Sequence, residues 1–426
     1  MLTKVRRALK NVYVFSILSR VVMVGVGFLY SILLARYLGT ELKGQLTYIN
    51  TITAITVIVC SFGMHQAYPY YRKQGTEGIG RTYGHICFLA LGGYIVIAAI
   101  AAAIVGNRDA RVTWAIALTP LLTFTKLVTY RVMVDDPNRK NAWEVVCELL
   151  EAAALALLLL FAPRNLTFAI AVLAGKNLIS CVYYLRASGA DLRITREDRA
   201  MLRRFAAFGF LPMLSLLMNN LNYRIDVLML GASVTDEQIG IYSVGIQIAE
   251  KVWLVSDALR DALFSKLIGG RDAEEVNKVI RICFTISLVI DLAIIAVGAP
   301  FIRICYGAEY AGAYEPLVIV LFGTLVMVFY KIIQTYNIVH KKQKLNFIFL
   351  AASVVANVIL NAVLIPLWGI NGAAAASLIS YSVCAFLFVF EYTRATGSKI
   401  RDLLILNRED LATIRKIGGK TNQQKG

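Results

Sequence analysis

Polar and charged side chains, among them an arginine able to bind an anion, lie within an otherwise apolar stretch at residues 205–231. The stretch is long enough to cross a membrane, yet its second half contains Asn219, Asn222, Arg224 and Asp226. A charge at the centre of a membrane helix costs roughly 2.5 to 3.5 kcal/mol on insertion scales, so these groups must face protein or water. At about 100° per residue, Asn219, Asn222 and Asp226 share one helix face, whereas Arg224 points about 160° away from Asp226. We predict a cavity-lining helix whose Arg224 finds its counter-charge on another helix or on a substrate; the alternative is a buried structural cluster.

Arg20 and Arg224 have no evident partner on adjacent predicted helices, which makes them candidates for binding phosphate. A planar guanidinium group can bind two phosphate oxygens at once, and nearby lysines would add positive potential. The predicted substrate-binding residues are Arg20, Asn219, Asn222, Arg224, Lys251 and Lys331. The candidates for binding a coupling ion or a proton are Asp226, Asp257 and Asp291. A purely structural role is an open alternative for each of these acids.

Six further charges lie level with one another when residues are counted from the turns between antiparallel helices. The three predicted ion pairs are Lys126–Glu148, Arg131–Glu144 and Glu151–Lys176. Because the three glutamates share one helix face, we interpret the pairs as structural links among the helices predicted at 112–132, 142–162 and 166–185. Lining of a transport path is the alternative. The same count, over a longer loop, brings Lys251 near Asp291.

The composition indicates a membrane protein with many spans. The chain has 426 residues, of which 58% are apolar and 17% charged, a balance that a soluble globular protein does not need. Twelve windows have about the 20 apolar residues that cross the hydrocarbon of a bilayer. They lie near residues 13–35, 45–67, 84–105, 112–132, 142–162, 166–185, 205–230, 239–262, 280–302, 314–338, 346–366 and 371–392. We predict an all-α integral membrane protein, because a β-barrel would show short alternating segments.

Lysine and arginine are distributed unequally between the two sides of the predicted membrane. The connections on one side contain only Arg36, Lys43, Arg108, Arg111, Arg164 and Arg303, although the chain has 44 such residues. The positive-inside rule therefore places both termini in the cytoplasm. The charged connection at 186–204 divides the chain into an N-terminal six-helix lobe (1–196) and a C-terminal six-helix lobe (197–392), followed by a basic cytoplasmic tail (393–426). Since each lobe begins at the cytoplasm, we predict parallel pseudo-repeats around a central cavity.

Several kinds of chemistry are disfavoured by the sequence. The net charge of +17 lies mostly in the connections, where anionic lipid headgroups account for it, so no nucleic-acid partner is predicted. The seven cysteines and three histidines show no spacing typical of a metal site, and no cofactor is predicted. No phosphate-binding loop of the form GxxxxGK followed by Ser or Thr is present, which disfavours an ATP-driven transporter. We predict no catalytic residues and no enzymatic activity.

Four short motifs resemble those of a known family. The sequence LLARYLGTELKG at 33–44 is similar to the first outer turn of bacterial polysaccharide lipid flippases, members of the multidrug/oligosaccharidyl-lipid/polysaccharide exporter superfamily. Three later stretches fit the same family: GMHQA at 63–67 with YYRK at 70–73, IGIYS at 239–243, and YGAEYAGA at 306–313. The resemblance covers nearly the whole chain. Its substrate arginines do not carry over by position, so Arg20 and Arg224 rest on the argument from the residues.

The resemblance implies two six-helix lobes around a cationic cavity that opens alternately to each side. It implies a protein of the bacterial cytoplasmic membrane that turns an undecaprenyl-pyrophosphate-linked glycan from the inner to the outer leaflet for cell-surface polysaccharide biosynthesis. The implied partners are the lipid-linked glycan, membrane lipids, and a polysaccharide polymerase with related assembly proteins. Twelve helices fit this branch better than the similar peptidoglycan-precursor flippases, which typically have two more.

Two other functions remain open. A cation-coupled multidrug or small-molecule antiporter of the same superfamily should favour an acidic, aromatic-lined cavity, whereas the predicted chamber contains arginine and lysine beside its acids. A membrane glycosyltransferase or polymerase should have catalytic carboxylates or arginines on sizeable outer loops, and the predicted outer loops are short.

Overall fold

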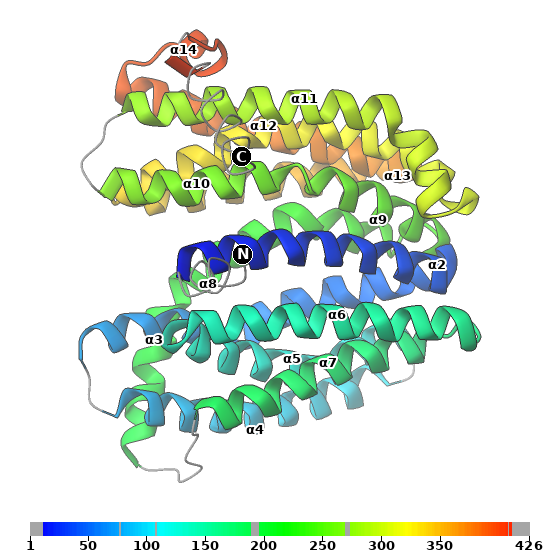
Figure 1. Ribbon diagram of the computed structural model, residues 1–426, viewed down its shortest axis with the longest axis vertical. Helices are drawn as coiled ribbons and strands as arrows, with labels where there is room; N and C mark the ends of the chain where they lie inside the picture. The colour runs from blue at the N-terminus through cyan, green and yellow to red at the C-terminus, as the bar shows by residue number, and fades with distance from the viewer. Residues whose placement is uncertain are drawn as a thin grey trace, which may run out of the picture. The chain divides into compact units, whose positions relative to one another are not determined.

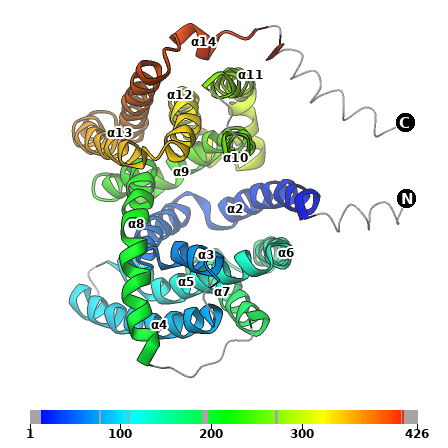
Figure 2. The same ribbon diagram turned by 90° about the vertical axis from the view of Figure 1, so that its left-hand side faces the viewer.

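The computed structural model describes residues 12–75, 78–106, 109–188, 196–268, 273–407 and 409–410, and the elements in this part of the chain are all helical (Figure 1). The chain forms two compact units, Met1–Leu217 (unit 1) and Met218–Gly426 (unit 2). Their border lies inside one long helix, α8 (Arg196–Leu230), which Figure 2 shows in green. The border expected from the sequence, at 196/197, falls at the start of this helix instead.

Unit 1 consists of six helices and the first part of α8. These helices are α2 (Val12–Cys60), α3 (Met64–Lys73), α4 (Ile79–Val105), α5 (Ala110–Asp135), α6 (Pro137–Phe161) and α7 (Leu166–Ser188). The central helix is α5, which packs against α2, α3, α4, α6 and α7. Its neighbours α4 and α7 expose large apolar side chains, as expected for helices that face lipid.

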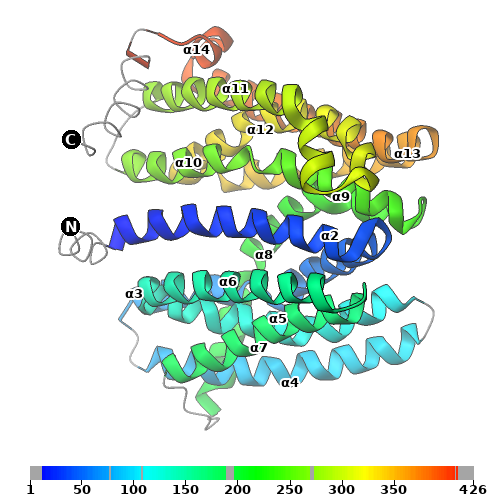
Figure 3. The same cartoon turned by 45° about the vertical axis from the view of Figure 1, so that its right-hand side comes forward.

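Unit 2 contains the rest of α8 and the following helices. These are α9 (Asp236–Glu250), α10 (Trp253–Ile268), α11 (Ala273–Cys305), the 3₁₀ helix η1 (Ala308–Ala313), α12 (Tyr314–Val339), α13 (Gln343–Thr396) and α14 (Ile400–Leu404). Helices α10 and α11 run side by side (Figure 3). The central helix is α12: 72% of its most apolar window is buried, compared with 6% for α4.

Eight helices among the described residues are long and apolar enough to cross a membrane, so the protein is a multi-pass membrane protein. Two of them contain a glycine with a positive φ inside the helix, Gly39 in α2 (71°) and Gly369 in α13 (54°). These are conformations that glycine adopts without steric cost, and they break the helix into two arms. The predicted window 13–35 falls on the first arm of α2, and 346–366 and 371–392 fall on the arms of α13. The window 45–67 is interrupted, because α2 ends at Cys60 and the last four residues of the window belong to α3.

Short polar side chains begin several helices. The Asp109 carboxylate accepts a hydrogen bond from the backbone N–H of Arg111 at the start of α5, at 2.8 Å. Asp136 does the same for Arg139 at 3.0 Å and is followed by Pro137 at the first helical position, where proline costs no hydrogen bond. Each cap satisfies a backbone donor that has no partner within the helix. The Asp109 cap lies at the start of α5, and the Asp136 cap lies between the end of α5 and the start of α6.

The first part of α8 packs closely against the other helices of unit 1. A Cβ atom built on Gly63 would lie 2.2 Å from the carbonyl oxygen of Gly209, so no larger residue fits either position without a backbone shift. One helical turn earlier, the fully buried ring of Phe205 stacks on Tyr71 and Tyr83, with centroids 5.1 and 5.6 Å apart. These contacts fix the part of α8 that precedes Pro212.

The first residues of the predicted basic tail are structured. Helix α13 continues to Thr396, and α14 packs against α11. Arg281 of α11 donates to the Asp410 carboxylate at 2.6 Å, and both side chains are almost completely buried. The described part of the segment predicted as a tail, up to Asp410, is therefore anchored on unit 2.

Candidate functional site

The second part of α8 places its polar residues within unit 2. Asn222 and Asp226 are buried, with 0% and 3% of their surface exposed, whereas Asn219 and Arg224 are partly exposed. Asn219 accepts a hydrogen bond from the hydroxyl of Tyr330 on α12 at 2.8 Å. The helix face expected for Asn219, Asn222 and Asp226 therefore looks towards the other helices of this unit.

Arg224 forms a two-pronged ion pair with Glu250, at the end of α9. Its Nη1 and Nη2 atoms each lie 2.8 Å from a different carboxylate oxygen of Glu250. Of the two counter-charges that the sequence left open for Arg224, one on another helix or one on a substrate, the structure has the first, on a helix where no partner was evident. A count of residues from the turn after Gly231 does not level Arg224 with Glu250, which is why the sequence did not reveal the pair. A bidentate Arg–carboxylate contact is a strong form of ion pair, so Glu250 occupies the guanidinium edge that would bind phosphate.

Lys331 is also paired. Its ammonium group lies 3.0 Å from Oδ1 of Asp257 on α10 and 4.6 Å from the ring centroid of Trp253. The same carboxylate oxygen lies 3.0 Å from Arg260, so Asp257 is shared by two cations. Lys331 itself is only 7% exposed. Arg260 also lies 3.3 Å from Asp261, so two cations face two carboxylates in this cluster.

Asp226 accepts three hydrogen bonds. The donors are the hydroxyl of Tyr242, the backbone N–H of Val227 at 2.7 Å, and the hydroxyl of Ser377 at 3.4 Å. Among the described residues, no basic side chain forms a hydrogen bond with this carboxylate. The arrangement joins α8 to α9 and to the second arm of α13.

Helix α13 contributes polar residues that the sequence reasoning missed. The Ser353 hydroxyl donates to the Asn222 side-chain oxygen at 2.8 Å, and the Asn357 amide donates to the Asn222 carbonyl at 3.3 Å. Asn361, one turn further, donates to the side chain of Asn357 at 2.5 Å. The signal was present, because two amides four residues apart share one face of an apolar helix. Together these groups form a buried polar cluster between α8 and α13.

Asp291 and Lys251 lie apart. Asp291 is 3% exposed, and both of its carboxylate oxygens lack a hydrogen-bond partner among the described residues, as does the hydroxyl of Ser287 one turn earlier. Lys251 is exposed at the junction of α9 and α10. The suggested contact between Lys251 and Asp291 is therefore absent.

In unit 1, one lysine takes two of the predicted acids. The Lys176 ammonium group lies 2.6 Å from Glu151 and 3.0 Å from Glu148. The expected pair Lys126–Glu148 does not form, because Glu148 meets Lys176 instead. Glu144 lies 2.5 Å from Lys140, one turn away on its own helix, in place of the expected contact with Arg131.

Arg131 and Arg20 complete the set of predicted charges. The guanidinium group of Arg131 lies against Gly80 and Gly84 of α4. Arg20 belongs to α2, but its side chain is outside the part of the structure that can be described.

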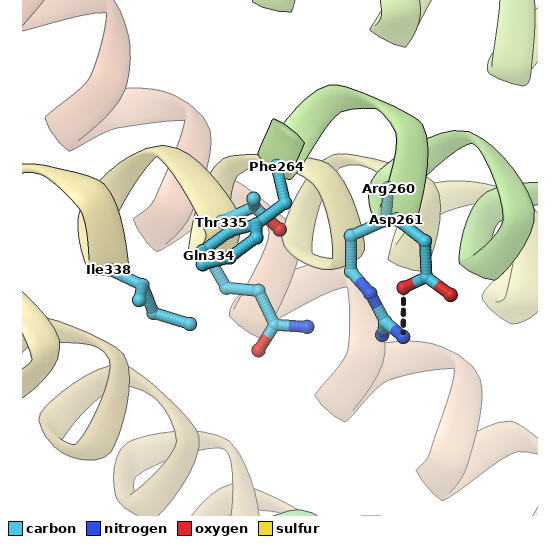
Figure 4. Close-up of a pocket in the computed structure, with 6 residues that line it drawn as sticks. All are labelled: Arg260, Asp261, Phe264, Gln334, Thr335 and Ile338. Carbon is cyan, nitrogen blue, oxygen red and sulfur yellow. Dashed lines mark hydrogen bonds and ion pairs between the residues drawn. The ribbon is translucent and has the colours of Figure 1, made fainter. Parts of the chain in front are cut away.

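A cavity of about 410 Å³ opens in unit 2 near the paired cations (Figure 4). It is lined by Arg260, Asp261, Phe264, Gln334, Thr335 and Ile338 of α10 and α12. Within it Arg260 donates to Asp261 at 3.3 Å, the contact drawn as a dashed line in Figure 4. The cavity thus presents an arginine with its carboxylate partner, an amide and a hydroxyl, which are groups able to bind a sugar.

The sequence matches the model of a known protein family. A family model described as "Polysaccharide biosynthesis protein" matches residues 8–252. "Probable flippase AglR" of Haloferax volcanii is 26% identical over 214 residues, which are 46% of this chain and 42% of that relative. The chain therefore matches less than half the length of this relative.

Two solved structures share the fold over most of their length. The structure described as "Lipid II flippase MurJ, inward closed conformation" has a TM-score of 0.72 at 14% identity, covering 92% of this chain and 89% of that one. An inward-facing multidrug resistance MATE family transporter of the MOP superfamily has a TM-score of 0.63 at 12% identity, covering 88% and 98%. At these identities the likeness establishes the fold alone.

Proposed function

This chain belongs to the polysaccharide biosynthesis protein family, and on that premise we propose that it is a flippase that moves an undecaprenyl-pyrophosphate-linked glycan from the inner to the outer leaflet by alternating access, for cell-surface polysaccharide biosynthesis. The observation that carries the proposal is the agreement of two independent matches. The family model covers residues 8–252, and 92% of the chain shares the fold of a structure named as a lipid II flippase. The name of the archaeal relative supports the same class of transport.

The physical need for such a protein is clear. A diphosphate with several sugars loses its hydrogen bonds to water when it enters hydrocarbon, and the cost of moving it unaided is prohibitive. A polar path through the protein removes this penalty for the headgroup, while the lipid tail stays in the bilayer. No soluble domain and no covalent chemistry are required.

In the proposed mechanism, the paired cations of unit 2 exchange their carboxylate partners for the diphosphate of the substrate. Arg224 and Lys331 are proposed to release Glu250 and Asp257 when a diphosphate arrives, and Lys251 and Asn219, which are not buried, add further contacts. Asn222 has no exposed surface, so its proposed part is to position α8 against α13. Arg20 is proposed as the contribution of α2.

Three acids are proposed for coupling to an ion. Asp226 is held by Tyr242 and Ser377, Asp257 is shared by Lys331 and Arg260, and Asp291 is buried without a partner among the described residues. Protonation of a paired acid would release its cation for the substrate. This links ion binding to headgroup binding at the same side chains.

The proposed topology has twelve crossings with both termini in the cytoplasm of a bacterial cell. Its support is the non-helical glycine in each of α2 and α13, which gives each helix two arms, together with the distribution of lysine and arginine. The helices α6 and α9–α10 supply the remaining crossings. To test this arrangement, a cysteine is introduced in place of Arg36 or of Lys341 and is labelled from either side of the membrane.

A reconstitution experiment tests the function. Proteoliposomes with a fluorescent polyprenyl-pyrophosphate glycan should show protein-dependent appearance of the glycan in the opposite leaflet. We expect Arg20→Ala and Arg224→Ala each to abolish translocation while the protein still inserts into the membrane. Unchanged translocation in both variants would remove these arginines from the site.

A matched control separates substrate binding from ion-pair loss. Arg224→Gln alone leaves Glu250 without its cation, whereas Arg224→Gln with Glu250→Gln removes both charges at once. If Arg224 binds the diphosphate, the double variant stays inactive although most of its stability is recovered. Recovery of translocation in the double variant would limit Arg224 to a structural role.

The alternative function is a cation-coupled multidrug or small-molecule antiporter. The observation that favours it is the fold shared with a multidrug resistance MATE family transporter. Replacing the labelled glycan with a fluorescent organic cation in the same vesicles separates the two functions. Transport of the cation without transport of the glycan would overturn the flippase proposal.

A further inference from the structure

Lys126, in the middle of α5, lacks a hydrogen-bond or ion-pair partner among the described residues, although it is only partly exposed. Its predicted partner Glu148 lies 3.0 Å from Lys176 instead. An unpaired ammonium group within a membrane helix is costly, by roughly 2.5 to 3.5 kcal/mol at the helix centre on insertion scales. The lysine therefore needs an anion that the described part of unit 1 does not supply.

The side chain of His65, on α3, presents a second unused donor beside Lys126. Its ring is fully buried, and neither ring nitrogen has a hydrogen-bond partner in the part of the chain that the structure describes. The ring lies edge-on to Tyr130 of α5 with centroids 4.4 Å apart, and it is close enough to Lys126 for the two groups to interact electrostatically. A neutral imidazole always carries one N–H group, so at least one buried donor here is unsatisfied.

Thr123 supplies a third. Its hydroxyl is fully buried and has no hydrogen-bond partner among the residues described. Thr123, Lys126 and Tyr130 share one face of α5 at spacings of three and four residues. Further along this face, Thr119 hydrogen-bonds to Thr56 of α2 at 2.8 Å, which shows that the face packs against α2. Buried polar atoms are normally hydrogen-bonded, so a group of unsatisfied donors points to a missing acceptor.

The geometry points to an anion-binding site in unit 1, formed by Lys126, His65 and Thr123, that receives a phosphate group of the lipid-linked diphosphate. The inference rests on the proposed function for the source of this phosphate. One ammonium, one imidazole N–H and one hydroxyl are all donors, and phosphate offers several strong acceptor oxygens to them. A sugar hydroxyl would leave the charge of Lys126 without compensation.

This assignment reverses the role that the sequence suggested for Lys126. Counting residues from the turn near Pro137 gave it a structural partner, but Glu148 and Glu151 both meet Lys176. Lys126 is left without a carboxylate partner among the described residues, and it lies beside His65, whose ring nitrogens also lack partners there. Unit 1 therefore contributes a cation that can bind an anion without breaking an ion pair among the described residues.

Binding of farnesyl diphosphate to the purified full-length protein tests the site. Isothermal titration in detergent should show that Lys126→Gln lowers the affinity at least about tenfold, the size expected for losing a charge-assisted hydrogen bond. Lys126→Arg should retain most of the affinity. His65→Phe, which keeps a ring against Tyr130 but removes the donor, should have a smaller effect of about threefold to tenfold.

Lys140→Gln is the matched control, because it removes one positive charge from unit 1 where a carboxylate is already the partner. We expect its affinity to stay within about twofold of the wild type. Thermal unfolding of each variant separates loss of binding from loss of fold. Equal affinity of Lys126→Gln and wild type, or an equal loss in Lys140→Gln, would overturn the assignment.

Two further ligands identify the source of the phosphate. Farnesol should bind without any dependence on Lys126, and inorganic pyrophosphate should bind more weakly than farnesyl diphosphate if the site serves a lipid headgroup. Equal, Lys126-dependent binding of both diphosphates would keep the anion site but assign it to free diphosphate. Farnesol binding that falls in Lys126→Gln as far as farnesyl diphosphate binding would overturn recognition of the anion.

This binding assay is independent of transport. Lys126-dependent binding without translocation by the wild type would keep the anion site and remove the flippase function. Translocation by the wild type with unaltered binding in Lys126→Gln would keep the flippase function and remove the anion site.

Discussion

Lys126 of α5 and Lys176 of α7 differ in one respect that bears on function. Lys176 meets two carboxylates, and in unit 2 Arg224 and Lys331 each meet one. Lys126 meets none among the described residues and lies beside the unsatisfied His65 instead. A paired cation stabilises the fold and reaches a substrate only when its pair opens, whereas Lys126 has its counter-charge still to find. The comparison teaches that a charge inside the membrane does not mark a binding site until its partners are known.

Breaking the Arg224–Glu250 pair should have the largest effect on stability. Arg224→Gln leaves a mostly buried carboxylate without its cation, and we expect a loss of about 2 to 4 kcal/mol, below the full range for buried pairs because the Arg224 side chain is 32% exposed. Adding Glu250→Gln should recover most of the loss. Denaturant unfolding in detergent measures both values. Equal stability of the single and double variants would show that the pair does not hold α8 to α9.

The two lysines of unit 1 should respond in opposite ways. Lys176→Gln removes the cation between Glu148 and Glu151, and we expect a loss of about 1 to 3 kcal/mol from the repulsion and desolvation that remain. Lys126→Gln removes a charge with no described partner, so stability should stay within about 0.5 kcal/mol or rise. The same unfolding assay compares them. A larger loss for Lys126→Gln would mean that it has a structural partner after all.

Removing the N-terminal cap of α5, with Lys126 unchanged, should have a small effect on stability. Asp109 caps this helix, and the hydrogen bond from Arg111 lowers the pKa of its carboxyl below the ordinary value of 3.8. Asp109→Ala should cost about 0.5 to 1 kcal/mol at neutral pH. Because the folded pKa is depressed, this contribution is present above pH 3.8 and is lost as the pH falls through the folded pKa. Farnesyl diphosphate affinity should stay unchanged; a loss like that of Lys126→Gln would assign the effect to α5 as a whole.

Much of the fold could be predicted from the sequence because length and apolarity determine it. The windows at 13–35 and 45–67 begin on the two arms of α2, since Gly39 permits the backbone break between them. The helical period also placed Asn222 and Asp226 on one face, and both are buried against other helices of unit 2. Periodicity is a local property, so it survives without knowledge of the neighbours.

The ion pairs were harder because they depend on distances between helices. Counting from a turn gave Lys176 the partner Glu151, and the structure has this contact at 2.6 Å. It could not show that the same lysine also takes Glu148, because acids three residues apart on one face compete for one cation. It did not give Arg224 its partner Glu250 either, since the two residues lie at unequal distances from their turn. The polar residues of α13 were missed although their spacing of four was visible.

The most direct test of the central claim compares two substrates that differ in the charge of the headgroup. Proteoliposomes containing the wild-type protein receive the same labelled glycan attached to a polyprenyl chain through a diphosphate or through an uncharged ether. We expect protein-dependent translocation of the diphosphate form alone, and its loss in Lys126→Gln. Equal movement of the uncharged form, or no movement of either above protein-free vesicles, would contradict the account.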